Sequence, residues 1–555
     1  MQTDVLIVGA GPTGLALACQ LIRYGVDFII IDKKETTTPH SKAIGVHART
    51  LEVYEQMGLA DKLIGLGAIA EKARMFAGGR VRGEVVFKDI GKGLSPYPYV
   101  LIVEQGKHER LIYDFIRSHG KDVRWQTELQ TFVQDTSGVS AQLKNGRGAT
   151  ETIQARYMVA CDGAKSPVRH ALGLKFEGST FERIFYVADV DIDWQYGHDA
   201  LQIFLMRNAL LAFFPMTGER QYRIVGTFPE EFAKDEGDIL YDEIEERIKL
   251  DADLDLDITK VNWFSTYKVH TRHVDSFSQS RCFLAGDAAH IHTPAGAQGM
   301  NTGIQDGYNL AWKLAAVLKN DAPESLLETY NEERLPVADQ LMETTDRFFN
   351  LAASPDRLLV FARLYIFPYI ANLAFSLDAI KRFVFPRISQ IAINYRYSSL
   401  SRTDGSFLVR AGDRMPWFTV NGSSIYDAFI GPAFHLVLFL DENTDVPPLP
   451  DDLMKSWAEN IGSHVFSLTP QITDIFGCRE SFFLILRPDN YIGLISKNFS
   501  AETVRNYLST FTSSDDNSLV LLRRPERDKD RIANLSLALP IGRLIDDLTI
   551  KEHRG

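Results

Sequence analysis

Two short apolar runs with a helical pattern between them open the chain. The runs are Val5–Val8 and Phe28–Ile31. Between them, apolar residues recur at the spacing of a helix face, at Ala16, Leu17, Cys19 and Leu21. Runs of this length are typical of buried strands, so the pattern predicts a strand, a helix and a second strand.

A second informative stretch is Arg281–Asn301. It reads as a strand that ends in Gly-Asp, then a loop rich in proline and glycine, then the start of a helix. Apolar residues follow at helical spacing, at Ile304, Tyr308, Ala311, Leu314, Ala315 and Leu318. We expect a buried helix whose apolar residues pack in the core.

The middle of the chain is rich in β patterning. The run that begins at Tyr157 ends in Asp162-Gly163, which alone indicates only a common turn. Residues near 179–274 continue the pattern, and Ala209–Met216 with Tyr222–Phe228 reads as a hairpin. Residues 340–398 look helical, and alternating short elements after Ser401 indicate a small α/β unit.

Glycines follow the first apolar run in the spacing GxGxxG, at Gly9, Gly11 and Gly14, and the second run ends in Asp32. Glycines let backbone N–H groups approach a pyrophosphate, and a helix N-terminus adds partial positive charge. An acid at this place accepts hydrogen bonds from an adenosine ribose. The layout predicts a dinucleotide site.

Composition narrows the function further. The chain has 555 residues and a formal net charge of -12, which argues against general nucleic-acid binding. Its four cysteines form no CxxC pair, so we expect neither a zinc site, nor any other metal site, nor a disulfide framework. Because the cysteines are so few, we expect the protein to lie in the reducing cytoplasm. Met1 runs almost directly into the first strand, so we expect no signal peptide.

Leu364–Ile380 is mostly apolar, with Arg363 before it and Lys381-Arg382 after it. A membrane-spanning helix needs about 20 apolar residues, and this stretch is shorter and contains Pro368 and Asp378. We expect buried helices near the substrate entrance or a subunit contact. A role at a membrane surface stays open as the less favoured alternative.

Taken together, these motifs resemble those of class A FAD-dependent monooxygenases of the para-hydroxybenzoate hydroxylase and phenol hydroxylase type. The matching segments are VGAGPTGLALA, HARTLEVYEQMGL, EQGKHERLI, ACDGAKSPVR and LAGDAAH with GMNTGIQDGYNLAWKLA. They extend over most of residues 1–340. The string His47-Ala48-Arg49-Thr50 is closest to hydroxylases of aromatic polyketides.

The resemblance implies which residues bind FAD. Glycines of the first loop line the pyrophosphate, two residues flank the adenosine, and one aspartate holds the ribityl hydroxyls. Backbone N–H groups at the start of the later helix face the isoalloxazine, where reduced flavin carries negative charge. The full set is Gly9, Gly11, Pro12, Thr13, Gly14, Asp32, Lys33, Arg49, Gln105, Asp162, Gly286, Asp287, Gly299, Met300 and Asn301.

The implied architecture is an α/β fold with a Rossmann-like FAD-binding domain, a β-sheet substrate domain and a C-terminal thioredoxin-like domain. The segment RPDNYIGL resembles the last of these, which lacks CxxC and is therefore expected to dimerise or to act as a scaffold. We assign the FAD-binding domain to 1–178, with a short substrate-domain insertion near 75–100, and to 275–398. The substrate-binding sheet is assigned to 179–274, the thioredoxin-like domain to 399–525 and a C-terminal extension to 526–555.

The implied reaction is hydroxylation of a phenolic or polyketide-like aromatic ring by O₂ through a flavin C4a-hydroperoxide. NADPH or NADH supplies the electrons, and the cofactor performs the difficult step. Baeyer–Villiger oxidation or epoxidation on the same scaffold stays open, as does a flavin-binding protein without catalysis. The expected partners are a small aromatic substrate, O₂ and a second copy of the chain in a homodimer.

Substrate contacts are predicted from fewer signals. Ile44 stands where simple phenol hydroxylases carry an aspartate that helps to deprotonate the phenol, and Ala297 replaces a usual glycine. A histidine that titrates near neutral pH is useful on the phenol side. The catalytic candidates are His47, Tyr267 and His270, although His47 could cap a helix and Tyr267 could belong to the core. The candidate pocket walls are Phe213, Phe214, Met216 and Pro294.

Overall fold

The structure is a computed structural model that describes residues 1–511 apart from short gaps. The gaps are 40–42, 208, 229–238, 294, 320–321, 355 and 442–460. Pro294, residues 512–525 of the expected thioredoxin-like domain and the extension 526–555 therefore lie outside the described residues. All described residues belong to one compact unit, Met1–Ser513.

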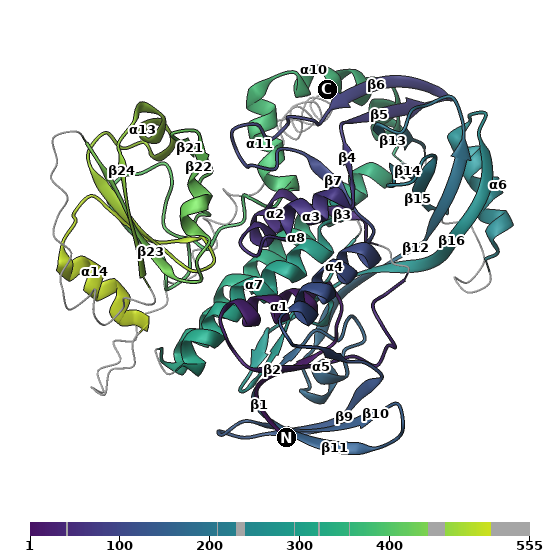
Figure 1. The fold of residues 1–555 in the computed structure, drawn as a ribbon. Coiled ribbons are helices and arrows are strands. Elements are labelled where there is room, and N and C mark those ends of the chain that lie inside the picture. Colours follow the sequence, from purple (N-terminus) through teal and green to yellow (C-terminus); the bar gives the residue numbers. More distant parts are fainter. Residues whose placement is uncertain are drawn as a thin grey trace, which may run out of the picture. The chain divides into compact units, whose positions relative to one another are not determined.

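A sheet with a parallel centre forms the amino-terminal region, in the order β17-β18-β11-β1-β2-β8 (Figure 1). The predicted strand–helix–strand unit is confirmed as β1 (Gln2–Val8), α1 (Pro12–Arg23) and β2 (Phe28–Ile31). β1 pairs in parallel with β2 and with β11, although β11 lies far along the chain. The other strands are β8 (Val123–Arg124), β9 (Thr127–Gln134), β10 (Val139–Asn145), β11 (Thr150–Ala160), β17 (Ser278–Gln279) and β18 (Cys282–Leu284).

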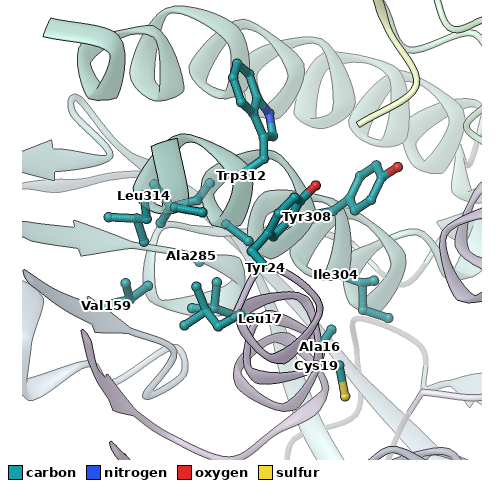
Figure 2. Packing of buried hydrophobic residues seen from close by; sticks show 14 of the residues in the cluster. Ala16, Leu17, Cys19, Tyr24, Val159, Ala285, Ile304, Tyr308, Trp312 and Leu314 are labelled. Carbon is teal, nitrogen blue, oxygen red and sulfur yellow. The ribbon is translucent and has the colours of Figure 1, made fainter. Parts of the chain in front are cut away.

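The predicted buried helix is α7 (Gly299–Leu318), and it packs along α1. Figure 2 shows Leu17 of α1 on the side of α7, which presents Tyr308 and Leu314, whereas the sulfur of Cys19 points away from α7. Leu17 and Leu314 are fully buried, so each contributes roughly 2–5 kcal/mol relative to alanine. Other helices of this region are α2 (Ala48–Glu55), α3 (Ala60–Gly65), α4 (Gln105–Ser118), α5 (Pro167–Ala171) and α8 (Glu328–Ala353).

A second sheet has the order β19-β16-β12-β15-β14-β13-β5-β6, and α6 (Tyr241–Ala252) covers one of its faces (Figure 1). The predicted hairpin is confirmed as β14 (Leu210–Pro215) and β15 (Gln221–Thr227). β5 and β6 come from the segment near 75–100 and form one edge. The remaining strands are β5 (Lys72–Ala77), β6 (Arg80–Val86), β12 (Phe176–Asp193), β13 (Ala200–Leu205), β16 (Asp257–Val274) and β19 (His290–Ile291).

A three-stranded sheet packs on the other face of β14 through an apolar cluster. That cluster joins Ile44, Ala70 and Ile102 to Phe214 and Met216. The side chain of Arg223 on β15 reinforces the contact because its Nη1 donates to the carbonyl of Ala43 (3.1 Å). The strands of the small sheet are β3 (Gly45–Val46), β4 (Ala68–Ala70) and β7 (Val100–Ile102).

The carboxyl-terminal α/β unit is built on a five-stranded sheet in the order β20-β26-β25-β23-β24. Its strands and the helix α13 enclose a separate apolar core that includes Phe439, Phe476 and Phe482, whereas α14 packs in the main core through Val504, Tyr507 and Leu508. The elements are β20 (Arg402–Asp404), β23 (Phe434–Leu440), β24 (Ile461–Ser467), α13 (Pro470–Phe476), β25 (Phe482–Leu486), β26 (Ile492–Ser496) and α14 (Ala501–Leu508).

Within the single chain, most of Leu364–Ile380 is exposed and not buried as expected, while a subunit contact there stays a prediction. α9 (Arg357–Phe361), a π-helical turn (Ala362–Ile366) and α10 (Phe367–Phe375) run on continuously, and α11 (Asp378–Ile388) follows. Only 11% of the apolar window in Arg357–Phe375 is buried. Among the described residues this is the one helix long and apolar enough to cross a membrane by length and composition.

Buried charges tie the loop after β25 to α7 and α8. Glu333 accepts from Lys313 Nζ (2.8 Å) and from both terminal nitrogens of Arg487 (2.6 and 3.0 Å). Arg487 in turn pairs with Asp489, which accepts from Trp312 Nε1 (3.0 Å). Burial lowers the pKa of Lys313 to about 8, so Arg487 is the stronger partner.

Replacing Glu333 with glutamine should lower the free energy of unfolding by about 3–5 kcal/mol, because the buried Lys313 loses its counter-charge and Arg487 keeps only Asp489. The cations hold the pKa of Glu333 below its usual range. The carboxylate therefore stabilises the fold above its unfolded pKa of about 4.3, and this contribution is lost as pH falls. Chemical denaturation at neutral and acidic pH measures both effects.

The matched control is Glu343→Gln on the same helix. Glu343 is exposed and lies 3.6 Å from Arg347, so its loss should change stability by less than about 1 kcal/mol. Equal destabilisation by the two variants would contradict the role given to the buried network.

Candidate cofactor and substrate site

The loop between β1 and α1, together with the first turn of α1, contains glycines of two physical kinds. Gly9 has φ +106°, and a Cβ there would lie 2.2 Å from the carbonyl oxygen of Cys161. A Cβ on Gly14 would lie 2.0 Å from the carbonyl oxygen of Gly9. A Cβ on Gly11 would meet no protein atom within 4 Å. The fold therefore requires Gly9 and Gly14, whereas the space at Gly11 is open for a ligand.

Asp32, at the end of β2, holds this loop in place. Its Oδ2 accepts from the N–H of Ala10 (2.7 Å), and its Oδ1 accepts from the N–H of Lys34 (2.8 Å). A carboxylate has about four acceptor positions, so further positions are available to ribose hydroxyls. Pro12 begins α1, and Lys33 beside Asp32 is exposed.

Thr13 is the point where the distant motifs meet. A Cβ on Gly286 would lie 2.4 Å from Thr13 Oγ1, and one on Gly303 would lie 2.3 Å from the same atom. Gly286 begins a short 3-10 helix, Gly286–Ala288, and Gly303 lies in the first turns of α7. With the contact between Gly9 and Cys161, three segments far apart in sequence share one site.

Asp287 lies at the open side of this junction. Its neighbours Gly286 and Ala288 are buried, whereas Asp287 is exposed. Desolvation by the surrounding protein nevertheless raises the pKa of its carboxyl. The carboxyl of Asp287 is thus reachable by solvent but has protein close around it, which indicates a concave site. A residue that faces a bound cofactor is expected to lie in such a site.

The start of α7 offers backbone donors. The first intrahelical bond runs from Thr302 N–H to the carbonyl of Gln298 (2.9 Å), so the N–H groups of Gly299, Met300 and Asn301 precede the helical ladder. The Asn301 side chain is buried and bonds to Gly45, Ala297 and Thr50. Ala297 keeps the left-handed conformation of the glycine it replaces, with φ +54°.

Asp162 contributes a buried acceptor. Its Oδ2 accepts from Val168 N–H (3.2 Å), while Oδ1 is buried without a partner. Burial raises the pKa of this carboxyl. Open space at Gly11, N–H groups at a helix start and an unpartnered acceptor fit a flavin dinucleotide.

That Arg49 contacts FAD stays a prediction. Its guanidinium is 1% exposed, and its Nε is buried without a protein partner. It donates to Glu52 (3.2 Å) and to the carbonyl of Asp489 (2.9 Å), with Tyr491 against it. Arg49 therefore joins α2 to the carboxyl-terminal unit. Gln105 is half-buried at the start of α4 and donates to Glu109 (2.7 Å).

His47 precedes α2 and is almost fully buried. Its Nε2 lies 2.9 Å from the carbonyl of Gly296, and its backbone N–H donates to Asn301 Oδ1 (3.0 Å). Burial lowers the pKa of the ring to about 4, so the imidazole is neutral at neutral pH. His47 lies against the loop before α7, where it positions that loop, and a contact with substrate stays a prediction.

Tyr267 and His270 lie on opposite faces of β16 because they are three residues apart. Tyr267 stacks on Phe185, and burial raises its pKa to about 12. His270 faces Thr180, whose Oγ1 lies 2.8 Å from its Nδ1. The two cannot both contact one substrate. We keep Tyr267, which shares an apolar cluster with Leu210, and revise the prediction for His270.

The same alternation divides the candidate pocket walls. Phe213 is fully buried in the core beneath α6, so its assignment as a pocket wall is wrong. Phe214 and Met216 lie on the opposite face, toward Ile44. That face is partly open. It also presents Leu210, Ala212 and Val225, which the sequence did not indicate as pocket walls.

Two buried ion pairs that sequence reasoning also missed support the site. Arg223 forms a bidentate pair with Asp189 (2.6 and 2.7 Å) on the open face of the sheet. Asp306 accepts from Gly286 N–H (2.9 Å) and pairs with Arg334 (2.7 Å). Arg334 and a nearby histidine hold the pKa of the Asp306 carboxyl below its usual range. The signal available for the second pair was Asp306, the one acidic residue in the buried helix α7.

Known proteins share these features. A family model described as FAD binding domain matches residues 2–345. A flavin-dependent monooxygenase of Mycobacteroides abscessus is 33% identical over 91% of this chain and 99% of its own length. A rifampicin monooxygenase of Rhodococcus hoagii is 30% identical over 89% and 95%. The solved structure of OxyS anhydrotetracycline hydroxylase from Streptomyces rimosus matches with a TM-score of 0.74 and 25% identity, covering 93% and 100%.

The chain belongs to the FAD-dependent aromatic monooxygenases. FAD is therefore its cofactor. When bound, FAD supplies the redox chemistry and the activation of O₂, while the residues around it bind and orient it. Among the described residues, no group of three or more histidine, cysteine, aspartate or glutamate side chains is arranged to hold a metal ion.

The Gly11→Val variant should fold but fail to bind FAD, because its side chain enters space that no protein atom occupies. The unfavourable residue at the start of α1 should cost only about 1 kcal/mol. Thermal unfolding of the apoprotein and FAD titration by fluorescence separate the two effects. Gly14→Val is the control, which should destabilise the fold itself. Normal FAD affinity in Gly11→Val would reject this loop as the pyrophosphate site.

The Asp287→Ala variant should weaken FAD binding by about 10- to 100-fold, because hydrogen bonds to a charged acceptor contribute roughly 1.5–3 kcal/mol each. Calorimetric titration of the apoprotein with FAD measures the change. Asp275→Ala removes an exposed carboxylate just after β16 and should leave the affinity unchanged. An unaltered affinity in Asp287→Ala would remove the ribityl assignment.

Proposed function

We propose that this monooxygenase uses NADPH or NADH to hydroxylate a phenolic or polyketide-like aromatic compound. The observation that carries the proposal is the partly open face of β14 and β15 opposite α6. This face presents Leu210, Ala212, Phe214 and Val225, and the small sheet at Ile44 packs against part of it. Such a surface suits the flat apolar faces of a fused aromatic ring system.

The chain's residues bind, orient and shield the reactants. The backbone N–H groups of Gly299, Met300 and Asn301 at the start of α7 would stabilise the negative charge that a bound flavin develops. The apolar wall on β14 excludes water from the ring. The Arg223–Asp189 pair lies on the same face as Phe214 and brings fixed charge to the edge of that wall. Tyr267, protonated because of its raised pKa, offers a neutral hydroxyl.

Similar proteins support the substrate class. The name of one relative described above refers to rifampicin, and that of the solved structure refers to anhydrotetracycline. Ile44 removes the carboxylate that simple phenol hydroxylases use, which favours larger rings over simple phenols. Baeyer–Villiger oxidation or epoxidation is the alternative, and it would yield lactone or epoxide products.

The proposal includes a cytoplasmic location and a homodimer. All four cysteines are free thiols, which suits a reducing compartment. The homodimer rests on the resemblance of the carboxyl-terminal unit to that of phenol hydroxylase relatives.

The test is consumption of NADPH and of NADH by the FAD-loaded enzyme across a panel of phenols and fused-ring polyketides. A true substrate should accelerate nicotinamide oxidation and give a product heavier by one oxygen atom, with a ring hydroxyl located by NMR. If no panel member accelerates the reaction, or if the products are lactones or epoxides, the proposal fails.

A substitution on the open face tests whether β14 contacts the substrate. Ala212→Trp should raise KM by roughly 10-fold or more, because the large ring fills the open face. FAD content should stay at the wild-type level, since Ala212 is not among the cofactor residues. An unchanged KM would remove β14 from the substrate site.

A further inference from the structure

The helix Arg357–Phe375 has apolar residues on two sides. Over it, an 18-residue window has a mean hydropathy of 1.7, and 11% of that window is buried. Pro368 and Ala371 are buried, and Ala371 packs with Phe375 against Met75 and Val85 of β5 and β6. A Cβ on Gly83 would lie 2.5 Å from the carbonyl oxygen of Pro368. This side anchors the helix along the edge of the sheet, as Figure 1 shows for α10 and β6.

The opposite side is an exposed apolar stripe. Its residues recur at i, i+3, i+4 and i+7, which places them on one helix face. They are Ile366, Tyr369, Ile370 and Leu373, with exposed fractions of 41% to 71%. A second row in α9 and the π-helical turn repeats the spacing and consists of Leu358, Phe361 and Tyr365, with 53% to 79% exposed.

The net charge of the residues around the stripe is opposite in sign to the net charge of the whole chain. Residues 356–388 contain five basic and two acidic side chains, so their formal charge is five minus two, or +3. The whole chain carries -12. The basic residues lie before, within and after the stripe, at Arg357, Arg363, Lys381, Arg382 and Arg387.

We propose that the segment 356–388 docks the protein on the surface of an anionic lipid membrane. Aromatic and aliphatic side chains on the outward face would enter the boundary between headgroups and acyl chains. The exposed basic residues Arg357, Arg382 and Arg387 would pair with lipid phosphates. The helix lies on the surface and does not span the membrane, because its other side is packed on β5 and β6. The inference stands apart from the proposed function, since membrane binding is measured without turnover.

A second copy of this chain is a less suitable occupant. A symmetric dimer places the same patch on both sides of the contact. Two patches of charge +3 would then face each other, which opposes association. An anionic membrane, in contrast, complements both the charge and the apolar stripe.

The experiment is flotation of the full-length FAD-loaded protein with lipid vesicles. Vesicles of phosphatidylcholine mixed with phosphatidylglycerol should bind the protein at least about tenfold more tightly than phosphatidylcholine alone, and salt should weaken the binding. Leu373→Glu should reduce binding to the anionic vesicles by about tenfold or more, because it places a charge in the apolar stripe.

The matched control is Leu250→Glu. Leu250 and Leu373 are both leucines on helices and are each 71% exposed, but Leu250 lies on α6. Its variant should bind vesicles like the wild type. The double variant Arg357→Gln, Arg382→Gln should lose the preference for anionic lipid, and it carries the test if Leu373→Glu does not fold. FAD content shows that each variant is folded.

Three results would overturn the proposal. One is a wild-type protein that does not float with anionic vesicles, and another is a Leu373→Glu variant that binds as tightly as the wild type. The third is a wild-type protein that does not bind vesicles but forms a dimer, seen by light scattering, which the Leu373→Glu substitution dissociates.

Discussion

The close approach of α1 to three other segments is the contact on which the site depends. Gly9 touches the carbonyl of Cys161, while Gly286 and Gly303 both lie against Thr13. A single methyl group at any of these glycines would separate the segments by more than packing tolerates, since interiors are close to crystal density. Asp306 strengthens the same junction because it binds the N–H of Gly286 and neutralises Arg334. The cofactor site is thus a consequence of backbone packing.

Local sequence patterns were sufficient to predict those elements whose signals lie close together in the chain. The strand–GxGxxG–helix unit, the hairpin of β14 and β15 and the helix after Met300 all have signals within about twenty residues, and the structure confirms these elements. Family resemblance supplied the FAD site as a set. The open space at Gly11 and the accessible but surrounded Asp287 agree with it.

What the sequence did not reveal depends on partners far along the chain. Arg49 donates a hydrogen bond to the carbonyl of Asp489, which lies 440 residues later in the sequence, and no local pattern predicts that contact. Phe213 is buried because α6 covers its face of the sheet. Alternation on a strand separates two faces but does not say which one the neighbouring domain covers. The apolar segment Leu364–Ile380 was expected to form buried helices, yet apolar composition indicates burial only where another element supplies the partner surface.

The side chains near the expected ring position constrain how the substrate is activated. Ile44 provides no carboxylate, burial keeps His47 neutral and Tyr267 stays protonated. Between about pH 5 and pH 11 neither of these two titratable groups changes charge, so neither supplies an ionised base for a phenol. With a ring pKa of about 4, the neutral His47 is only a weak base, which favours a substrate ring that contributes acidity of its own. A fused aromatic system does so more readily than a simple phenol, because its anion is delocalised over more atoms. The apolar wall on β14 and the missing carboxylate therefore select for the same kind of substrate.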